Sequence, residues 1–385
     1  MVDDYNNIDL FVPTKSERAQ GIKRGEILKE LHDPKAPADL LYAPVAFAAD
    51  NDFFRACFLK RDDFANTLKK LNQGVGGSAV VLGWLALALI VYAQFLESQE
   101  LTDPEPWREN LVHQLSAVST ALSIVAFVAA GVSIFVLKNA WLRQRYCTER
   151  MRQFFYQNML SHLPDILSAS GHAPAEKQFK DLTTSEFKTF AYIHLQRSRA
   201  QFLRVARRRA GRGPDWLLTP LDAPAIAALT PSATLDAFFR LCLRFRIEWQ
   251  AGYARYAINK ASGLGRLISN GLFLFVFLAI GLHIIIVALA SLGQLDENAK
   301  TIELWLLEFA LVGLMLKAFE EGLQTQREAE RYEEYLAKCE RAKELFTAQG
   351  ASVADKYAAL LDLESAAYEE MKGFIRTNYD ARFLL

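Results

Sequence analysis

Residues 267–292 of this chain read LISNGLFLFVFLAIGLHIIIVALASL, without a single Asp, Glu, Lys or Arg. The hydrocarbon core of a bilayer is about 30 Å thick, and a helix needs about 20 predominantly apolar residues to cross it. Three further apolar runs approach or meet that length; they are residues 78–96, 117–137 and 302–319. We therefore expect an all-α, polytopic membrane protein with four transmembrane helices.

The four runs form two pairs, and the members of each pair are joined by a short connection, residues 97–116 or 293–301. This arrangement predicts two transmembrane hairpins. Each connection holds one basic residue, Arg108 or Lys300, whereas Lys and Arg are frequent at the opposite ends of the runs. Cytoplasmic loops of membrane proteins are enriched in Lys and Arg. We therefore expect a multi-pass protein of the inner (plasma) membrane with both termini in the cytoplasm.

Outside the apolar runs the sequence is charged and rich in helix-favouring residues, which predicts a helical cytoplasmic domain. The chain holds 44 basic and 44 acidic residues, so its net charge gives no reason to expect nucleic acid as a partner. The four cysteines are far apart and form no CxxC pair. Neither a structural disulfide nor a zinc site is therefore predicted.

Two halves of the chain share an order of short motifs. The motifs before the hairpins are FFRACF at 53–58 and FFRLCL at 238–243. The motifs after the hairpins are QR at 144–145 with ER at 149–150, and QR at 326–327 with ER at 330–331. The matching order at both ends of the hairpins favours a tandem duplication. The alternative is chance similarity between helices rich in Leu and Arg.

This repeat predicts a layout of four segments. They are an N-terminal arm (1–51), a first repeat (52–165), a connector (166–235) and a second repeat (236–385) that ends in an amphipathic helix. No proline interrupts residues 117–162 or 304–349. In each repeat the second span is therefore predicted to continue as one long helix into the cytoplasm. Glycines at 74, 76 and 77, and at 263 and 265, predict breaks before the first and third spans.

The sequence contains no HExxH, no P-loop and no Gly-x-Ser-x-Gly elbow. Its six histidines have no metal-ligand spacing. We therefore expect no enzyme activity, no metal and no cofactor, and a lipid-active enzyme with a dispersed active site is the least favoured class.

Two ionisable residues, Glu308 and His283, fall inside predicted spans. Such groups cost about 3 kcal/mol at membrane depth and usually face protein or water. Glu308 lies early in the fourth span and His283 lies toward the outer end of the third, so a hairpin brings them to similar depth. One interpretation is that they line an ion path or gate. The other is that Glu308 lies near the interface, or hydrogen-bonds to His283 and holds the hairpin together.

A basic run lies in the connector. Its arginines include Arg204, Arg207, Arg208, Arg209 and Arg212. Three interpretations remain open: the run binds anionic lipid headgroups, it binds a phosphorylated signal or nucleic acid, or it is a solvated face with acidic neighbours.

The stretch WLRQR at 141–145, followed by ER at 149–150 directly after a hairpin, resembles the pattern of the SLATT-type two-transmembrane domains of bacterial conflict systems. This chain would hold two such domains, at 52–165 and 236–375, although the second has Phe319 where a Trp is expected. The resemblance implies a membrane effector of antiphage defence. Such an effector forms or disrupts a pore when a sensor protein or a nucleotide signal reports infection, and it has no catalytic activity.

Two hypotheses on function follow. The first is a homo-oligomeric channel or membrane-permeabilising effector in the lipid bilayer, gated by its cytoplasmic helices. The second is a non-conducting membrane-anchored scaffold or receptor that recruits a cytoplasmic partner. Ion flux through reconstituted vesicles separates the two.

Overall fold

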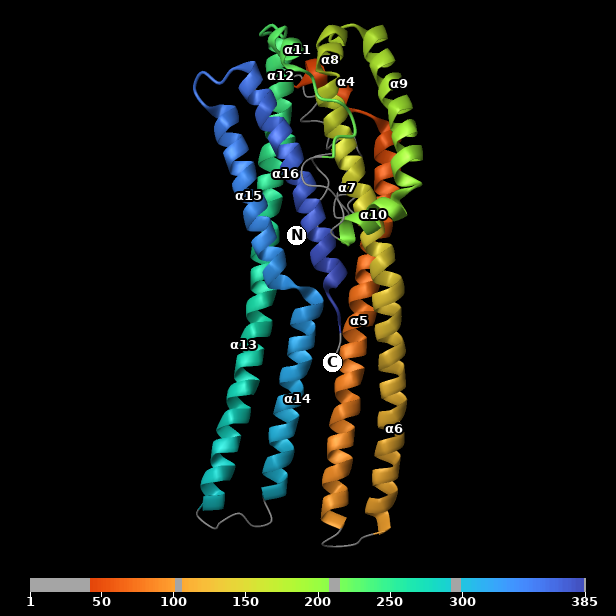
Figure 1. Ribbon diagram of the computed structural model, residues 1–385, viewed down its shortest axis with the longest axis vertical. Coiled ribbons are helices and arrows are strands. Elements are labelled where there is room, and N and C mark those ends of the chain that lie inside the picture. Colours follow the sequence, from red (N-terminus) through yellow and green to blue (C-terminus); the bar gives the residue numbers. More distant parts are fainter. Residues whose placement is uncertain (1–41, 101–105, 208–214, 292–298, 384–385) are drawn as a thin grey trace. The chain divides into compact units, whose positions relative to one another are not determined.

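The computed structural model describes residues 42–100, 106–207, 215–291 and 299–383 (Figure 1). All regular structure within these residues is helical, which confirms the predicted all-α fold. Of the predicted N-terminal arm, residues 42–51 form two short helices, η3 (Ala43–Val45) and α4 (Ala46–Ala49). The rest of the arm lies outside the described residues.

The helices follow the order expected from the repeat. The first repeat contains α5 (Asp52–Glu100), α6 (Pro106–Gly131), the π-helical η4 (Val132–Leu137) and α7 (Lys138–Ser161). The connector contains α8 (Leu163–Ala169), α9 (Ala173–Phe190), the π-helical η5 (Ala191–Leu195), α10 (Ser198–Ala206) and α11 (Ala223–Ala227). The second repeat contains α12 (Ala233–Leu241), the π-helical η6 (Cys242–Glu248), α13 (Trp249–Ser291), α14 (Ala299–Leu323), α15 (Thr325–Thr347) and α16 (Val353–Asp380).

The chain divides into two compact units. The polar unit comprises residues 1–65, 142–259 and 328–377, and the apolar unit comprises residues 66–141, 260–327 and 378–385. Each unit therefore takes segments from both repeats.

An aromatic core holds the first-repeat part of the polar unit together. Phe54 on α5 stacks on Phe155 of α7 with 5.2 Å between ring centroids, and it meets Phe187 of α9 edge-on at 5.0 Å. Phe154 stacks on Phe190 of α9 at 4.8 Å. Residues four apart share a helix face, which is why the motif at 53–58 buries both of its inward phenylalanines.

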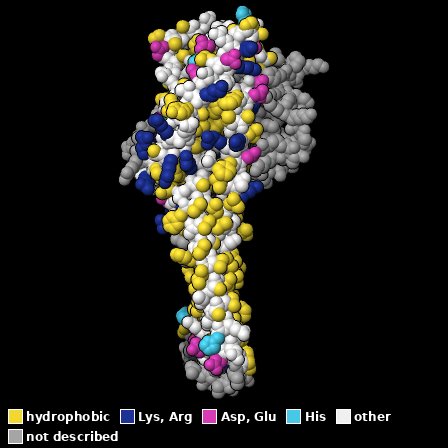
Figure 2. All heavy atoms as spheres, turned by 90° about the vertical axis from the view of Figure 1, so that its right-hand side faces the viewer, with side chains coloured by type: hydrophobic (Ala, Val, Ile, Leu, Met, Phe, Trp, Pro, Cys, Tyr) yellow, Lys and Arg dark blue, Asp and Glu magenta, His cyan; other side chains and the backbone are white. Residues whose placement is uncertain are grey.

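Hydrophobic side chains cover the helices of the apolar unit (Figure 2). Phe127 on α6 is 81% exposed and Phe273 on α13 is 72% exposed. Contiguous exposed surfaces of this kind are rare on soluble proteins, whereas hydrocarbon solvates them without cost. Three described helices are long and apolar enough to cross a membrane; they are Asp52–Ser98, Trp107–Ser161 and Ala233–Leu289.

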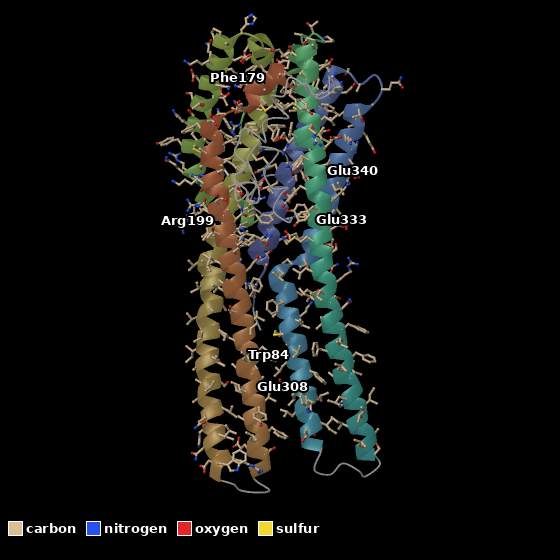
Figure 3. All side chains as sticks on the ribbon, turned by 180° about the vertical axis from the view of Figure 1, so that it is seen from behind. Trp84, Phe179, Arg199, Glu308, Glu333 and Glu340 are labelled. Atoms are coloured by element: carbon tan, nitrogen blue, oxygen red, sulfur yellow. The ribbon has the colours of Figure 1, made fainter. Side chains whose placement is uncertain are left out.

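The helix α14 is the remaining predicted span. Its stretch 302–319 contains Glu303, Glu308 and Lys317, and this charge content separates it from the other three. The fourth span therefore stays a prediction. Within the apolar unit, α5 lies beside α6 and α13 beside α14 (Figures 1 and 3). The Ser119 hydroxyl donates to the carbonyl oxygen of Ala86 at 2.8 Å, and a Cβ on Gly271 would lie 3.2 Å from Leu316 Cδ1.

The predicted breaks at the glycines are wrong. Helix α5 runs unbroken through Gly74, Gly76 and Gly77, and α13 runs through Gly263 and Gly265. Two of these glycines instead allow close approach of another segment. A Cβ on Gly265 would lie 3.0 Å from Thr325 Oγ1, and one on Gly76 would lie 2.5 Å from the Phe383 ring.

The predicted long helices have different outcomes. The helix Trp107–Ser161 is continuous through η4, as expected for residues 117–162. The helix predicted over residues 304–349 is broken between α14 and α15 by Gln324, which has a φ of 53°. A left-handed backbone at a residue other than glycine is unfavourable, and neither proline nor glycine marks this position. The break therefore could not be predicted from helix-breaking residues.

Candidate functional site

A cluster of buried charges lies within the polar unit and joins helices from both repeats. We call it the ionic cluster. It consists of Asp62, Arg145, Glu149, Arg152, Arg246, Arg331, Glu364 and Glu370. Two of its residues, Arg145 and Glu149, come from the motif after the first hairpin, and Arg331 comes from the motif after the second.

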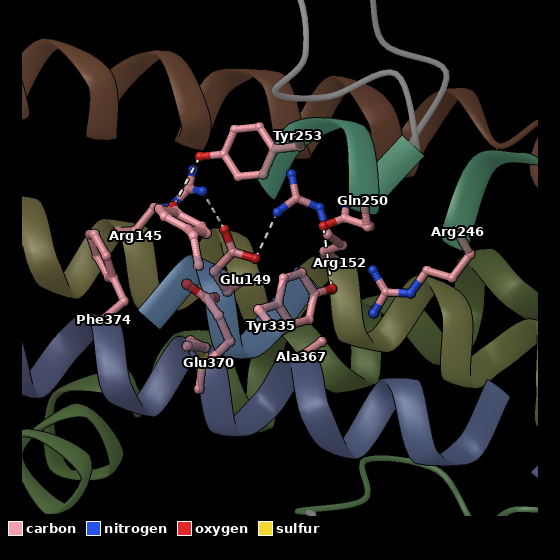
Figure 4. Close-up of a pocket in the computed structure, with 12 residues that line it drawn as sticks. Arg145, Glu149, Arg152, Arg246, Gln250, Tyr253, Tyr335, Ala367, Glu370 and Phe374 are labelled. Carbon is pink, nitrogen blue, oxygen red and sulfur yellow. Dashed lines mark hydrogen bonds and ion pairs between the residues drawn. The ribbon is translucent and has the colours of Figure 1, made fainter. Parts of the chain in front are cut away.

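Glu149 is the centre of the first-repeat part. Its two carboxylate oxygens accept from different arginines, with Arg145 Nη2 at 2.6 Å and Arg152 Nη1 at 2.7 Å (Figure 4). These three residues are three or four positions apart on α7, so they lie on one helix face. Arg145 also reaches Asp62 on α5 at 3.3 Å. One carboxylate thus orders two guanidinium groups and links α7 to α5.

Arg246 and Glu364 form the most deeply buried pair. Their side chains are 3% and 1% exposed, and Arg246 Nη2 lies 2.6 Å from Glu364 Oε1. The guanidinium also lies 4.4 Å from the centre of the Tyr156 ring. Arg246 stands in the π-helical turn η6, a type of turn that is frequent at functional sites. The pair joins η6 to α16 across the interior of the polar unit.

Arg331 contributes the charge of α15. Its Nε lies 3.3 Å from Glu370 Oε1 on α16, and its Nη2 lies 3.6 Å from Glu328. The guanidinium carbon is 4.6 Å from the Tyr332 ring centre and 4.9 Å from that of Phe374. The Nη atoms are buried and have no hydrogen-bond partner among the described residues. Ion pairing and aromatic faces therefore take the place of hydrogen bonds there.

The cluster borders a small cavity of about 40 Å³. Its polar lining includes Arg145, Glu149, Arg152, Arg246, Gln250, Tyr253, Tyr332, Tyr335 and Glu370. The hydroxyl oxygens of Tyr253 and Tyr332 are 3.1 Å apart, and the Tyr335 hydroxyl donates to Gln250 Oε1 at 3.4 Å. A water molecule occupies about 30 Å³ in the liquid, so the cavity has room for very few waters. A nucleotide or a lipid headgroup does not fit.

The charges of the cluster balance, because four arginines face four carboxylates. Burial tends to raise the pKa of Glu149, but Arg145 and Arg152 outweigh it and lower the pKa below its usual value. For Glu370 burial prevails and raises the pKa, with Arg331 offsetting only part of the effect. A self-compensated cluster of this kind holds helices together in a defined arrangement. Nothing in its geometry activates a nucleophile.

The cysteines and histidines of the described residues support the same conclusion. Burial raises the pKa of Cys339 to about 12 and raises that of Cys242 as well, so both thiols stay protonated and unreactive. Within the described ranges no group of three His, Cys, Asp or Glu side chains could hold a metal ion.

The two residues predicted to line a path do not meet. Glu308 is half-buried on α14 (Figure 3), whereas His283 is exposed on α13. In the part of the chain that the structure describes, no hydrogen bond or ion pair joins them. The interpretation that they hold the hairpin together by a direct bond is therefore not realised in this structure, and only Glu308 turns partly inward.

The basic run is described in part. Arg204 is exposed on α10 and Arg207 is exposed directly after it, while Arg208, Arg209 and Arg212 lie outside the described residues. Arg199, on the same helix, is also exposed (Figure 3). Tyr192 on η5 is 62% exposed. The described part of this surface is therefore basic with one prominent aromatic side chain.

No protein family, characterised protein or solved structure that we compared with the chain matches it. The function must therefore be inferred from the residues themselves.

Sequence reasoning found one part of the site and missed the rest. The duplicated motifs contained Arg145, Glu149 and Arg331, which was the available signal. Arg246, Glu364 and Glu370 lie outside those motifs, and their partners are 118 positions away in the sequence for the Arg246–Glu364 pair. A pairing at that separation has no local pattern from which it could be recognised.

Proposed function

We propose that this chain is a membrane effector that crosses the bilayer four times, with α14 as the fourth span, and that permeabilises the membrane as a homo-oligomeric pore. The polar unit is placed in the cytoplasm, together with both termini, and controls the spans. The resemblance to SLATT-type domains supports a role in bacterial antiphage defence, with a sensor protein or a nucleotide signal as the trigger. The proposal includes no catalytic step.

The observation that carries the proposal is that single helices hold both the ionic cluster and the apolar stretches. The helix Trp107–Ser161 contains Arg145 and Glu149 as well as a membrane-length apolar window. The helix Ala233–Leu289 contains Arg246 as well as the most apolar run of the chain. A helix is stiff over such lengths. A rearrangement of the cluster is therefore transmitted along the same rods that carry the spans.

Glu308 is the residue we assign to the path. It is half-buried on a helix otherwise rich in Leu and Phe. Keeping an acidic side chain at such a position is costly unless it faces water or protein. A water-filled path lined by Glu308 in an oligomer supplies that environment, and His283 is the second candidate for the lining.

The test is ion flux from vesicles that contain the purified full chain. We expect potassium efflux from the protein-containing vesicles, and a reduction of at least about tenfold for Glu308→Gln. Glu303→Gln is the matched control, because Glu303 is exposed on the same helix, and it should change efflux less than about twofold. Absence of efflux from every sample, or a monomer in native mass spectrometry, would remove the pore and leave the anchored receptor.

A second function is favoured by a specific feature, a cleft of about 340 Å³ between α15 and α16. Ala342, Leu345 and Leu363 give it an apolar lining, and Lys338, Arg341, Asp362 and Glu369 add charges. Such a surface suits a receptor that recruits a cytoplasmic partner. The charge reversal Arg341→Glu distinguishes this function, because it should abolish partner recruitment and leave efflux unchanged.

The exposed arginines of α10 fit a contact with anionic lipid headgroups. Each basic residue near such a surface contributes about 1 kcal/mol, and tyrosine is enriched at membrane interfaces. The test compares vesicles with and without anionic lipid. Arg204→Gln with Arg207→Gln should reduce the salt-sensitive part of lipid binding, whereas an effect independent of lipid charge would contradict this assignment.

A further inference from the structure

The segment 378–383 at the end of α16 is packed into the apolar unit. Phe383 is 6% exposed and forms a buried cluster with Val80 of α5 and Ala318 of α14. Met315, Phe319 and Leu323 of α14 pack around this cluster. The ring of Phe383 therefore lies in contact with two helices that belong to different hairpins.

Two glycines make room for the ring, one on each of these helices. A Cβ on Gly76 of α5 would lie 2.5 Å from the Phe383 ring, and one on Gly322 of α14 would come closer still. Real Cβ atoms do not approach other atoms so closely, so any side chain at either position would displace the ring. The fit between one aromatic side chain and two glycines is specific to this segment.

Lys138 holds the backbone of the same segment. Its ammonium group donates to the carbonyl oxygens of Tyr379 and Ala381, both at 2.8 Å, and it lies 5.9 Å from the centre of the Tyr379 ring. Lys138 is the first residue of α7, immediately after η4. The segment is thus fixed by its side chain to α5 and α14 and by its backbone to the end of the second span.

The surroundings contain two further irregularities. Ser133 in the π-helical η4 donates to Asn72 Oδ1 of α5 at 2.9 Å, which ties these two elements together at the level of Gly76. On the other side, Gln324 takes its left-handed conformation two residues after Gly322. Irregular backbone of this kind is where helices change direction when a protein changes state.

We propose that residues 378–383 are a releasable latch that holds α5 against α14, and that release of the latch opens the spans. This role rests on the proposed function as a pore. Helix α16 also carries Glu364 and Glu370 of the ionic cluster and runs directly into the latch. A rearrangement of the cluster therefore pulls on the latch through a single helix. The contact consists of one aromatic ring and one lysine, which is small enough to be reversible.

The first experiment measures release without measuring permeation. Ala381 is buried, so Ala381→Cys should react slowly with a membrane-impermeant maleimide in the full chain. Phe383→Ala should speed this labelling at least tenfold, and Lys138→Met should do the same. Arg382→Ala is the matched control, because Arg382 is exposed beside the latch, and it should leave the rate unchanged. All variants carry Cys57→Ser, since the other three native cysteines are buried. Equal labelling rates in all variants would overturn the latch.

The second experiment locks the segment in place. A Cβ on Gly322 would lie 2.7 Å from Phe383 Cγ, which puts the two Cβ atoms within about 4 Å of each other, in the range of a disulfide. The double variant Gly322→Cys with Phe383→Cys should therefore oxidise readily. We expect potassium efflux from vesicles to fall at least tenfold on oxidation and to return on reduction. Phe383→Ala should raise efflux above that of the unchanged chain.

The outcomes separate the two proposals. Efflux that is present but equal in the oxidised, reduced and Phe383→Ala samples would overturn the latch while the pore stands. Faster labelling of Phe383→Ala without efflux from any sample would overturn the pore and, with it, the regulatory role of the latch. Size-exclusion chromatography in detergent shows that each variant is folded.

Discussion

Helices α7 and α15 occupy corresponding places in the two repeats, but the structure uses them differently. Both carry the motif QR followed by ER. In α7, Arg145 and Glu149 are part of the ionic cluster. Their counterparts in α15, Arg327 and Glu330, are exposed. The same local sequence thus forms the centre of the polar unit in one repeat and a solvent-facing surface in the other.

The last arginine of the motif is the exception. Arg150 is 1% exposed, pairs with Asp215 Oδ2 at 2.9 Å and lies 5.2 Å from the Tyr368 ring. Arg331, its counterpart, is 9% exposed and pairs with Glu370. A buried guanidinium is therefore common to both copies, whereas the pairing around Glu149 belongs to the first copy alone. Duplication gave two similar helices, and packing gave them different partners.

The first prediction concerns the carboxylates of the two motifs and has the largest expected effect. Glu149→Ala leaves two buried arginines without their shared partner and should lower the free energy of unfolding by about 3–5 kcal/mol. The counterpart Glu330→Ala should change it by less than about 0.5 kcal/mol, as is usual for exposed positions. Thermal unfolding in detergent micelles measures both. Equal losses would mean that α7 and α15 are equivalent after all.

The second prediction concerns the C-terminal ends of the two helices. Directly after α7, His162 contacts Asp165 at 3.0 Å and Glu186 at 3.1 Å. The hydrogen bond to Glu186 outweighs burial and raises the pKa of His162 to about 9. The stabilisation is then complete below pH 6.5 and is lost as the pH rises through about 9. His162→Asn should therefore cost about 2 kcal/mol at pH 6 and close to nothing at pH 10.

Beyond the end of α15, Gly350 has a φ of 81° and no titratable group takes the role of His162. Gly350→Ala should cost about 1 kcal/mol at every pH, because a Cβ is unfavourable in the left-handed region. Denaturation of both variants at pH 6, 8 and 10 checks the pair. A loss for His162→Asn that does not change with pH would show that its ion pairs do not contribute.

The third prediction concerns the junctions between span and polar helix and has the smallest effect. Gly131 has ordinary helical angles and nothing within 4 Å of a Cβ, so Gly131→Ala should raise stability by about 0.5–1 kcal/mol. Gln324 donates to the carbonyl oxygen of Glu321 at 2.6 Å from a left-handed backbone. Gln324→Ala removes that bond and should cost about 1 kcal/mol. Changes of the same sign at both junctions would contradict the difference between a continuous and a broken helix.

Several features could be predicted from the sequence because they depend on local composition. The all-α class, three long apolar helices and the continuous helix after the second apolar run follow from hydrophobic runs and from the absence of proline. The glycine positions were misjudged. Gly76 and Gly265 lie within helices and serve as contact points, and whether a glycine breaks a helix or admits a neighbour depends on what packs against it.

The sequence by itself determined which segments are helical and which are too apolar to remain in water, because both properties arise within a few consecutive residues. Only the tertiary structure decided which motif charges are buried, where the second long helix breaks, and that Phe383 reaches two glycines far from it in the chain. These outcomes depend on pairings such as Arg246 with Glu364. A buried charge is stable only beside its partner, and folding alone brings such partners together.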